Sequence, residues 1–162
     1  SSTVGGAVYE ASELVQGKEY RCGEVGHMTI VPDGPACYCG KKGCLDVYCS
    51  SVKLSKMADG SLAQFFERLE RGEPEFVSAW DTYTTYLAVA LDNIRMVLDC
   101  DIVIGGYVGG YIGRYIEDVH RKVAERNIFE KRSSFVRPCV FRYEAAALGA
   151  ALSVIEAYVD QV

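Results

Sequence analysis

The stretch GEVGHMTIVPDGPACYCGKKGCLD, residues 23–46, decides how this chain folds. It has neither the alternation of a strand nor the roughly 3.6-residue period of a helix, and its Pro, Gly and Lys residues are typical of turns. Something other than a hydrophobic core must therefore order it. The stretch holds one histidine and three cysteines in the spacing His-x9-Cys-x-Cys-x4-Cys: His27, Cys37, Cys39 and Cys44.

These four side chains predict a metal site. Three thiolates and one imidazole are a ligand set of tetrahedral structural zinc. Gly40 and Gly43 supply the turns that bring the last two cysteines to one ion, and Lys41 and Lys42 lower the cost of gathering thiolates. Four protein ligands fill the coordination sphere, so we expect structural zinc and no hydrolytic chemistry. The alternative is a set of reduced surface or core thiols, which would leave the stretch without an ordering force.

The composition indicates one acidic globular domain. The chain has 162 residues, 49% of them hydrophobic and 24% charged, which excludes a disordered chain. No apolar run reaches the ~18 residues of a membrane span, so we expect no membrane association. The net charge of −5 disfavours direct contact with nucleic acid. Seven cysteines, an odd count, favour a reducing compartment and a cytoplasmic protein.

Around the cysteine-rich stretch, the patterns predict an α/β domain. Ser61 and Gln64 form a capping-box pattern, Gly72 is placed to close that helix, and the apolar positions from Phe76 to Leu98 predict a long core helix. The other expected elements are strands over 3–10 and 13–21 around a Gly17–Lys18 turn, strands over 28–32, 101–106 and 135–142, and helices over 112–123 and 148–159.

The same cysteine-rich stretch resembles the ROK family (repressor, open reading frame, kinase). The family pattern is Glu-x-Gly-His followed by Cys-x-Cys-Gly-x-x-Gly-Cys-Leu-Glu, and residues 24–27 and 37–46 follow it except at the last position. VGGAV at 4–8, VIGGYVG at 103–109 and the tail from Gly149 also look like ROK sequence, in the expected order. The resemblance therefore covers nearly the whole chain.

The resemblance implies a fold and an assembly. Residues 1–162 would form a single domain, the C-terminal lobe of an actin-like, ribonuclease-H-like ATPase fold, with the zinc knot inserted at about 23–50. The family's N-terminal lobe, which carries the catalytic aspartate, and the helix-turn-helix domain of ROK repressors are not expected within these residues. ROK proteins are commonly dimers or tetramers, so a homo-oligomer is expected.

The resemblance also places Glu24, His27 and Asp46 at sugar-contacting positions. With one His27 nitrogen on zinc, the ring is oriented and the other nitrogen is free for a sugar hydroxyl. The carboxylates of Glu24 and Asp46 can also bind sugar hydroxyls, because charged acceptors make the stronger hydrogen bonds. Asp46 is one methylene shorter than the family's Glu, and capping of nearby backbone is an alternative role for it.

Two glycine-rich segments bear on whether the chain handles ATP. ROK kinases carry Gly-x-Gly-x-Gly-Gly around the ATP phosphates, and here Gly5 and Gly6 remain while Ser1 and Thr3 replace expected glycines. A Cβ at such a position disfavours positive φ and close approach to a phosphate. This departure lowers the expectation of kinase activity.

The second glycine-rich segment points the same way. Gly105 and Gly106, near the expected adenosine loop, are followed by bulky Tyr107. We therefore expect a sugar-sensing effector domain of a ROK-type regulator, in which a sugar or sugar phosphate closes an inter-lobe cleft. DNA would be bound by an N-terminal domain and not by residues 1–162.

Two alternatives to this regulator are considered. One is the C-terminal half of a ROK sugar kinase that uses ATP and Mg²⁺, and the other is an interaction module cross-linked by zinc. No catalytic residue is assigned within the chain.

Overall fold

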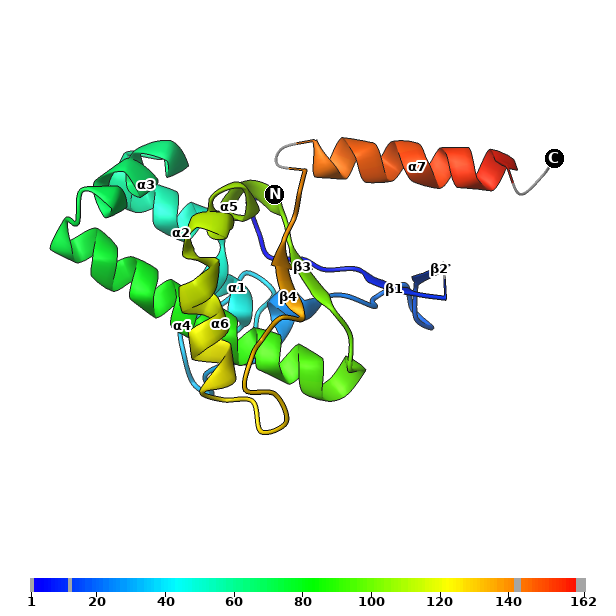
Figure 1. The fold of residues 1–162 in the computed structure, drawn as a ribbon, viewed down its shortest axis with the longest axis horizontal. Helices are drawn as coiled ribbons and strands as arrows, with labels where there is room; N and C mark the ends of the chain where they lie inside the picture. The colour runs from blue at the N-terminus through cyan, green and yellow to red at the C-terminus, as the bar shows by residue number, and fades with distance from the viewer. Residues whose placement is uncertain (1, 12, 142–143, 160–162) are drawn as a thin grey trace.

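The computed structural model describes residues 2–11, 13–141 and 144–159 (Figure 1). Among these residues, no helix combines the length and the apolarity needed to cross a membrane. The elements, in chain order, are β1 (Val8–Glu10), β2 (Glu13–Val15), η1 (Val25–His27), α1 (Leu45–Cys49), α2 (Ser51–Ser55), η2 (Lys56–Ala58), α3 (Leu62–Glu70), α4 (Pro74–Leu98), β3 (Ile102–Ile104), α5 (Gly106–Ile112), η3 (Gly113–Tyr115), α6 (Ile116–Ala124), β4 (Val136–Pro138) and α7 (Ala145–Val159).

The first two strands form a short antiparallel hairpin. The chain reverses between Glu10 and Glu13, whose Cα atoms are partners in the ladder. The predicted turn at Gly17–Lys18 does form, because the Tyr20 N–H donates to the Gly17 carbonyl at 3.4 Å. It lies beyond β2, so the prediction that it connects the two strands is wrong. Residues 28–32 form no strand, and Thr29 makes only an isolated bridge with Cys44.

The other two strands form a parallel pair. Ile102 lies opposite Val136, and α5, η3 and α6 make the crossover that a parallel connection requires. Pro138 ends β4, an edge position that tolerates its missing N–H. The ladder continues one residue further, because the Cys139 N–H donates to the Ile104 carbonyl at 2.9 Å. In Figure 1, β3 and β4 run side by side while α7 extends away from the other helices.

Helix signals in the sequence place α3 and α4 correctly. The Ser61 hydroxyl accepts the Gln64 N–H at 3.2 Å, which confirms the predicted N-cap. Pro74 is the first residue of α4, where its missing N–H costs nothing, and α4 runs for 25 residues. Gly72, with φ of +73°, adopts the left-handed conformation that separates the two helices.

An aromatic cluster forms the centre of the core. Phe66 of α3 is 1% exposed and stacks on Tyr111 of α5 with ring centroids 4.1 Å apart. Its edge contacts Trp80 of α4, whose ring lies 5.0 Å from that of Tyr115. Because one side chain touches three helical segments, Phe66 fixes how α3 and α5 pack on α4.

A buried lysine ties α6 to α4. The Lys122 side chain is 5% exposed, and its ammonium lies 2.7 Å from a carboxylate oxygen of Asp81. It also donates to the Thr84 hydroxyl at 2.6 Å and to the Asp81 carbonyl at 2.8 Å. A buried ammonium is stable only when paired and hydrogen-bonded in this way. The contact therefore joins α6 to α4 across 41 positions of the sequence.

The Phe66 cluster predicts a large loss of stability on truncation. Phe66→Ala is expected to lower the free energy of unfolding by about 3–5 kcal/mol, because it removes a buried ring and leaves a cavity. Phe129→Ala, the same change at a side chain 77% exposed, should stay within about 0.5 kcal/mol of the parent. Urea unfolding measures both. Equal losses for the two variants would contradict the central position of Phe66.

Candidate functional site

The structure brings His27, Cys37, Cys39 and Cys44 together. One ligand atom from each lies within 4.8 Å of the others. The sulfurs of Cys39 and Cys44 are 3.7 Å apart, and the Cys37 sulfur lies 3.8 Å from His27 Nδ1. Two sulfurs that share a tetrahedral zinc at about 2.3 Å lie about 3.8 Å apart. The spacing of the donors therefore fits a tetrahedral metal ion.

Backbone hydrogen bonds and one glycine create this convergence. The Cys37 N–H donates to the Lys41 carbonyl at 2.8 Å, and the Gly40 N–H donates to the Cys37 carbonyl at 3.0 Å. Gly43 has φ of +68°, and a Cβ there would lie 1.7 Å from the Val31 carbonyl oxygen. Position 43 thus accepts only glycine, and this close approach delivers Cys44 to the cluster.

The thiols of the cluster differ in acidity. Burial raises the pKa of the Cys44 thiol to about 11, with smaller contributions from Cys39 and Cys37. A backbone hydrogen bond from Lys41 lowers the pKa of the Cys39 thiol. A bound cation deprotonates a coordinating thiol outright, so it would supply the charge that Cys44 needs to ionise near neutral pH. The Lys41 ammonium itself donates to the His27 carbonyl at 2.7 Å.

His27 lies between the cysteine cluster and the surface. Its Nδ1 faces Cys37, whereas its Nε2 lies 3.2 Å from the Tyr38 hydroxyl. Glu24 precedes η1 as its N-cap residue, and its side chain is exposed. The His27 N–H donates to the Glu24 carbonyl at 3.0 Å, which fixes one residue relative to the other. No pattern in the sequence singles out Tyr38.

Asp46 is turned toward the N-terminal segment. Its carboxylate is almost fully buried and accepts the Val4 N–H at 2.5 Å. Val4 also packs closely against η1. A Cβ on Gly26 would lie only 2.1 Å from the Val4 carbonyl oxygen. Asp46 therefore holds backbone 42 residues away, which differs from the capping of nearby backbone that was its alternative role.

The two predicted nucleotide loops differ in backbone conformation. Gly5 and Gly6 are exposed, and φ is not positive at either. Gly105 is the N-cap of α5 and Gly106 has φ of +74°, so this turn uses the freedom of glycine. The Tyr107 side chain is 47% exposed in the first turn of that helix. Ser1 lies outside the described residues.

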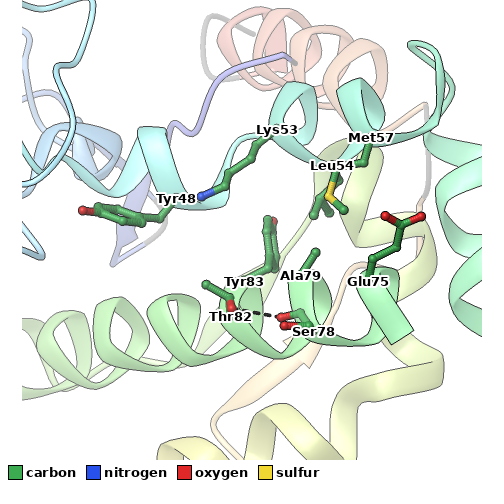
Figure 2. Close-up of a pocket in the computed structure, with 9 residues that line it drawn as sticks. All are labelled: Tyr48, Lys53, Leu54, Met57, Glu75, Ser78, Ala79, Thr82 and Tyr83. Atoms are coloured by element: carbon green, nitrogen blue, oxygen red, sulfur yellow. Dashed lines mark hydrogen bonds between the residues drawn. The ribbon is translucent and has the colours of Figure 1, made fainter. Parts of the chain in front are cut away.

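Figure 2 shows a groove that sequence reasoning did not predict. It has a volume of about 270 Å³ and lies between α4 and the α1–α2 segment. Lys53 extends over the Tyr48 ring at 5.2 Å, and the Thr82 hydroxyl donates to the Ser78 carbonyl at 2.9 Å. The Lys53–Tyr48 contact lies within the α1–α2 segment and the Thr82–Ser78 bond lies within α4, so neither joins the two walls of the groove. Its lining residues are Tyr48, Lys53, Leu54, Met57, Glu75, Ser78, Ala79, Thr82 and Tyr83.

Sequence comparison adds an independent line of evidence. A model described as ROK family matches residues 1–157. The N-acetylmannosamine kinase of Citrobacter koseri is 30% identical over 158 residues, which cover 94% of this chain and 53% of that protein. The corresponding kinase of Escherichia coli O1:K1 / APEC is 29% identical over 161 residues, with the same coverage. The chain thus spans about half the length of the curated relatives it matches.

Solved structures share the fold. A ROK hexokinase from Thermus thermophilus superposes with a TM-score of 0.76 at 24% identity, over 97% of this chain and 55% of that one. A ROK glucokinase from Streptomyces griseus, in complex with glucose and AMPPNP, superposes with a TM-score of 0.69 at 24% identity. The match covers 85% of this chain and 52% of that one. A ROK transcriptional regulator, a homologue of the E. coli MLC protein, superposes with a TM-score of 0.68 at 19% identity. The match covers 84% of this chain and 39% of that one. These likenesses confirm the predicted α/β fold of actin-like ATPase type.

The Asp46–Val4 contact predicts how the N-terminal segment is held against the cysteine-rich loop. Asp46→Asn is expected to lower the free energy of unfolding by about 1 kcal/mol, because a neutral amide oxygen accepts a weaker hydrogen bond than a carboxylate does. Residues 3–7 should then exchange their amide hydrogens faster. Asp33→Asn makes the same change at an exposed position of the loop and should alter neither quantity. Hydrogen-exchange mass spectrometry decides, and unchanged exchange of residues 3–7 would refute the contact.

Proposed function

The chain belongs to the ROK family, and on that premise we propose that it is a zinc-ordered, sugar-binding half of a ROK protein. The observation that carries the proposal is the two-sided position of His27. Its Nδ1 lies against the cysteine cluster and its Nε2 points away from it. One residue therefore joins the metal centre to the sugar site.

Zinc is the proposed metal. His27, Cys37, Cys39 and Cys44 would hold it, and their number leaves no open position for a reacting water. When bound, the ion supplies positive charge for the thiolates and cross-links the loop. Its role is then structural: it orients the His27 ring while the residues around that ring recognise the ligand.

The proposed ligand is a sugar or sugar phosphate. The exposed Glu24 carboxylate is an acceptor for sugar hydroxyls, next to the outward nitrogen of His27. Asp46 is the third member of the set, although one of its oxygens is already engaged by Val4. The glucose complex of the S. griseus relative and the sucrose complex of a Streptococcus pneumoniae ROK protein support a sugar as ligand.

We propose a sensing role for this site within a transcriptional regulator. Thr3 stands where ROK kinases have a phosphate-binding glycine, and the neighbouring Val4 N–H is held by Asp46. Bulky Tyr107 follows the second glycine pair, Gly105 and Gly106. Sugar binding would shift a homo-oligomer between conformations, by as much as its affinity for them differs. DNA would be contacted by another part of the protein, which we expect to be cytoplasmic.

The second candidate is a sugar kinase. It is favoured by the curated relatives, which are named N-acetylmannosamine kinases. A kinase would require ATP, Mg²⁺ and a catalytic base. Residues 1–162 would then contribute the sugar contacts and part of the nucleotide site, with Gly105 and Gly106 at the nucleotide.

The zinc proposal predicts a defined metal content. Elemental analysis of the purified protein is expected to give about one zinc per chain, since one four-ligand site binds one ion. Cys44→Ser should lose most of the metal. Cys49→Ser is the matched control, because Cys49 is equally buried but bonded to the Tyr83 carbonyl, so its zinc content should be unchanged. Equal zinc in the Cys44→Ser variant and the parent would refute the ligand set.

The sugar proposal predicts a specific loss at Glu24. The experiment uses the full-length protein, including any residues beyond 1–162, titrated calorimetrically with glucose, N-acetylglucosamine and N-acetylmannosamine. Glu24→Gln is expected to lower the affinity for the tightest-binding of these sugars by about tenfold or more, because it removes a charged hydrogen-bond acceptor. Glu19→Gln, a nearby exposed carboxylate, should bind as the parent does. If no sugar binds, the proposed function is wrong.

Assays of the full-length protein distinguish the sensing role from the kinase role. A sensor should show no sugar-dependent phosphoryl transfer from Mg·ATP, and its affinity for operator DNA should change with the sugar. Sugar-dependent turnover of ATP would contradict the sensing role and establish the kinase.

A further inference from the structure

A second groove lies between α6 and the segment that leads from it to β4 (Figure 1). It has a volume of about 390 Å³, within the ~300–1,000 Å³ that is usual for small-molecule sites. Its lining residues are Glu117, His120, Arg121, Ala124, Lys131, Arg132, Ser133 and Ser134. The groove is therefore built from other residues than the proposed metal and sugar sites.

The lining of this groove carries more cations than acids. Arg121, Lys131 and Arg132 are cationic, and Glu117 is the one carboxylate among the lining residues. The Arg121 guanidinium already bonds two nearby carboxylates. Lys131 and Arg132 are exposed and form no ion pair with any residue that the structure describes. The charge of the groove thus favours an anion, and two cations remain free to bind it.

The segment opposite α6 also offers neutral donors. The backbone N–H groups of residues 131–134 donate to no other group in the part of the chain that the structure describes. The exposed Ser134 adds a hydroxyl. Successive free N–H groups are a recurrent means of binding phosphate oxygens in proteins. This segment therefore combines positive charge with several hydrogen-bond donors.

Contacts on both sides hold the segment in place. Before it, the Asn127 side-chain oxygen accepts the Glu130 N–H at 2.8 Å, and Glu130 forms an ion pair with Arg95 of α4. Within it, the buried Ser133 hydroxyl donates to the His120 carbonyl of α6 at 3.1 Å. Positions 131 and 132 thus lie between two fixed points. Little backbone freedom would be lost on binding, which favours affinity.

We propose that this groove binds a phosphate group, either free phosphate or the phosphate of a small monoester, through Lys131, Arg132 and the backbone N–H groups of residues 131–134. A phosphate monoester carries about −1.5 to −2 charges at pH 7 and three strong acceptor oxygens. Two unpaired cations and a run of donors match both properties, and a guanidinium can bind two phosphate oxygens at once. The inference does not rest on the proposed sugar-binding function.

The test is calorimetric titration of the full-length protein, at constant ionic strength, with inorganic phosphate and with glycerol 3-phosphate. At least one of them is expected to bind, and the tighter ligand identifies whether free phosphate or a monoester is preferred. Arg132→Gln should weaken that binding about fivefold or more, because it removes a charge-assisted hydrogen bond. Arg71→Gln, the same change at an exposed arginine outside the groove, should leave the affinity unchanged.

A variant of the lining carboxylate tests the sign of the effect. Glu117→Gln removes the one negative charge among the lining residues and should tighten phosphate binding about twofold. A variant that only disturbed folding would weaken binding, so a gain in affinity reports on charge.

Hydrogen-exchange mass spectrometry locates the bound ligand. The tighter ligand should slow amide exchange of residues 131–134 in the parent and in Arg71→Gln. At the same ligand concentration, it should slow this exchange less in Arg132→Gln.

The outcomes also distinguish this groove from the proposed sugar site. Glu24→Gln should leave the affinity for inorganic phosphate and glycerol 3-phosphate unchanged, whatever it does to sugar binding. Binding of neither ligand, equal affinity in Arg132→Gln and the parent, or unchanged exchange of residues 131–134 would each overturn the proposal. Binding of duplex DNA with neither small ligand bound would overturn it as well.

Discussion

The convergence of one imidazole and three thiols is the constraint on which the rest of the site depends. The loop that carries them packs Met28, Ile30 and Val31 against the core, and its backbone is held by hydrogen bonds such as that from Cys37 to Lys41. The close approach of Gly43 to the Val31 carbonyl brings Cys44 back to the start of the loop. A cation that neutralised the thiolates would turn this arrangement from a set of weak contacts into a rigid cross-link.

The proposed sugar-contacting residues flank the cluster because the chain leaves it in two directions. Cys44 is the N-cap of α1, so Leu45 and Asp46 begin a helix whose first buried residue joins the main core. The Leu45 N–H donates to the Met28 carbonyl at 2.8 Å, which fastens this helix to the end of η1. His27 and Asp46 are thus placed by the same few residues that gather the cysteines. The proposed metal centre and the proposed sugar site form one structural unit.

Local signals in the sequence were sufficient for part of this arrangement. The ligand spacing, the Ser61 cap and the Pro74 helix start act over a few residues, and the structure follows each of them. Long-range contacts left no such signal. The Asp46–Val4 bond joins residues 42 apart, and nothing in the alternation of residues 3–21 fixed where the hairpin would turn. Tyr38 was overlooked because an x position of a cysteine motif has no pattern of its own.

The shorter side chain of Asp46 has a consequence for how a ligand would act. One carboxylate oxygen accepts the Val4 N–H, which leaves the other lone pairs for a sugar hydroxyl. A sugar that drew on this carboxylate would therefore change the energy of the contact holding residues 3–7 against η1. Ligand binding at the metal-ordered loop and the conformation of the glycine-rich segment would then be thermodynamically linked, each altering the other by the same free energy. Such a link is what a sensor requires, because occupancy of one site must be reported by a segment elsewhere in the chain.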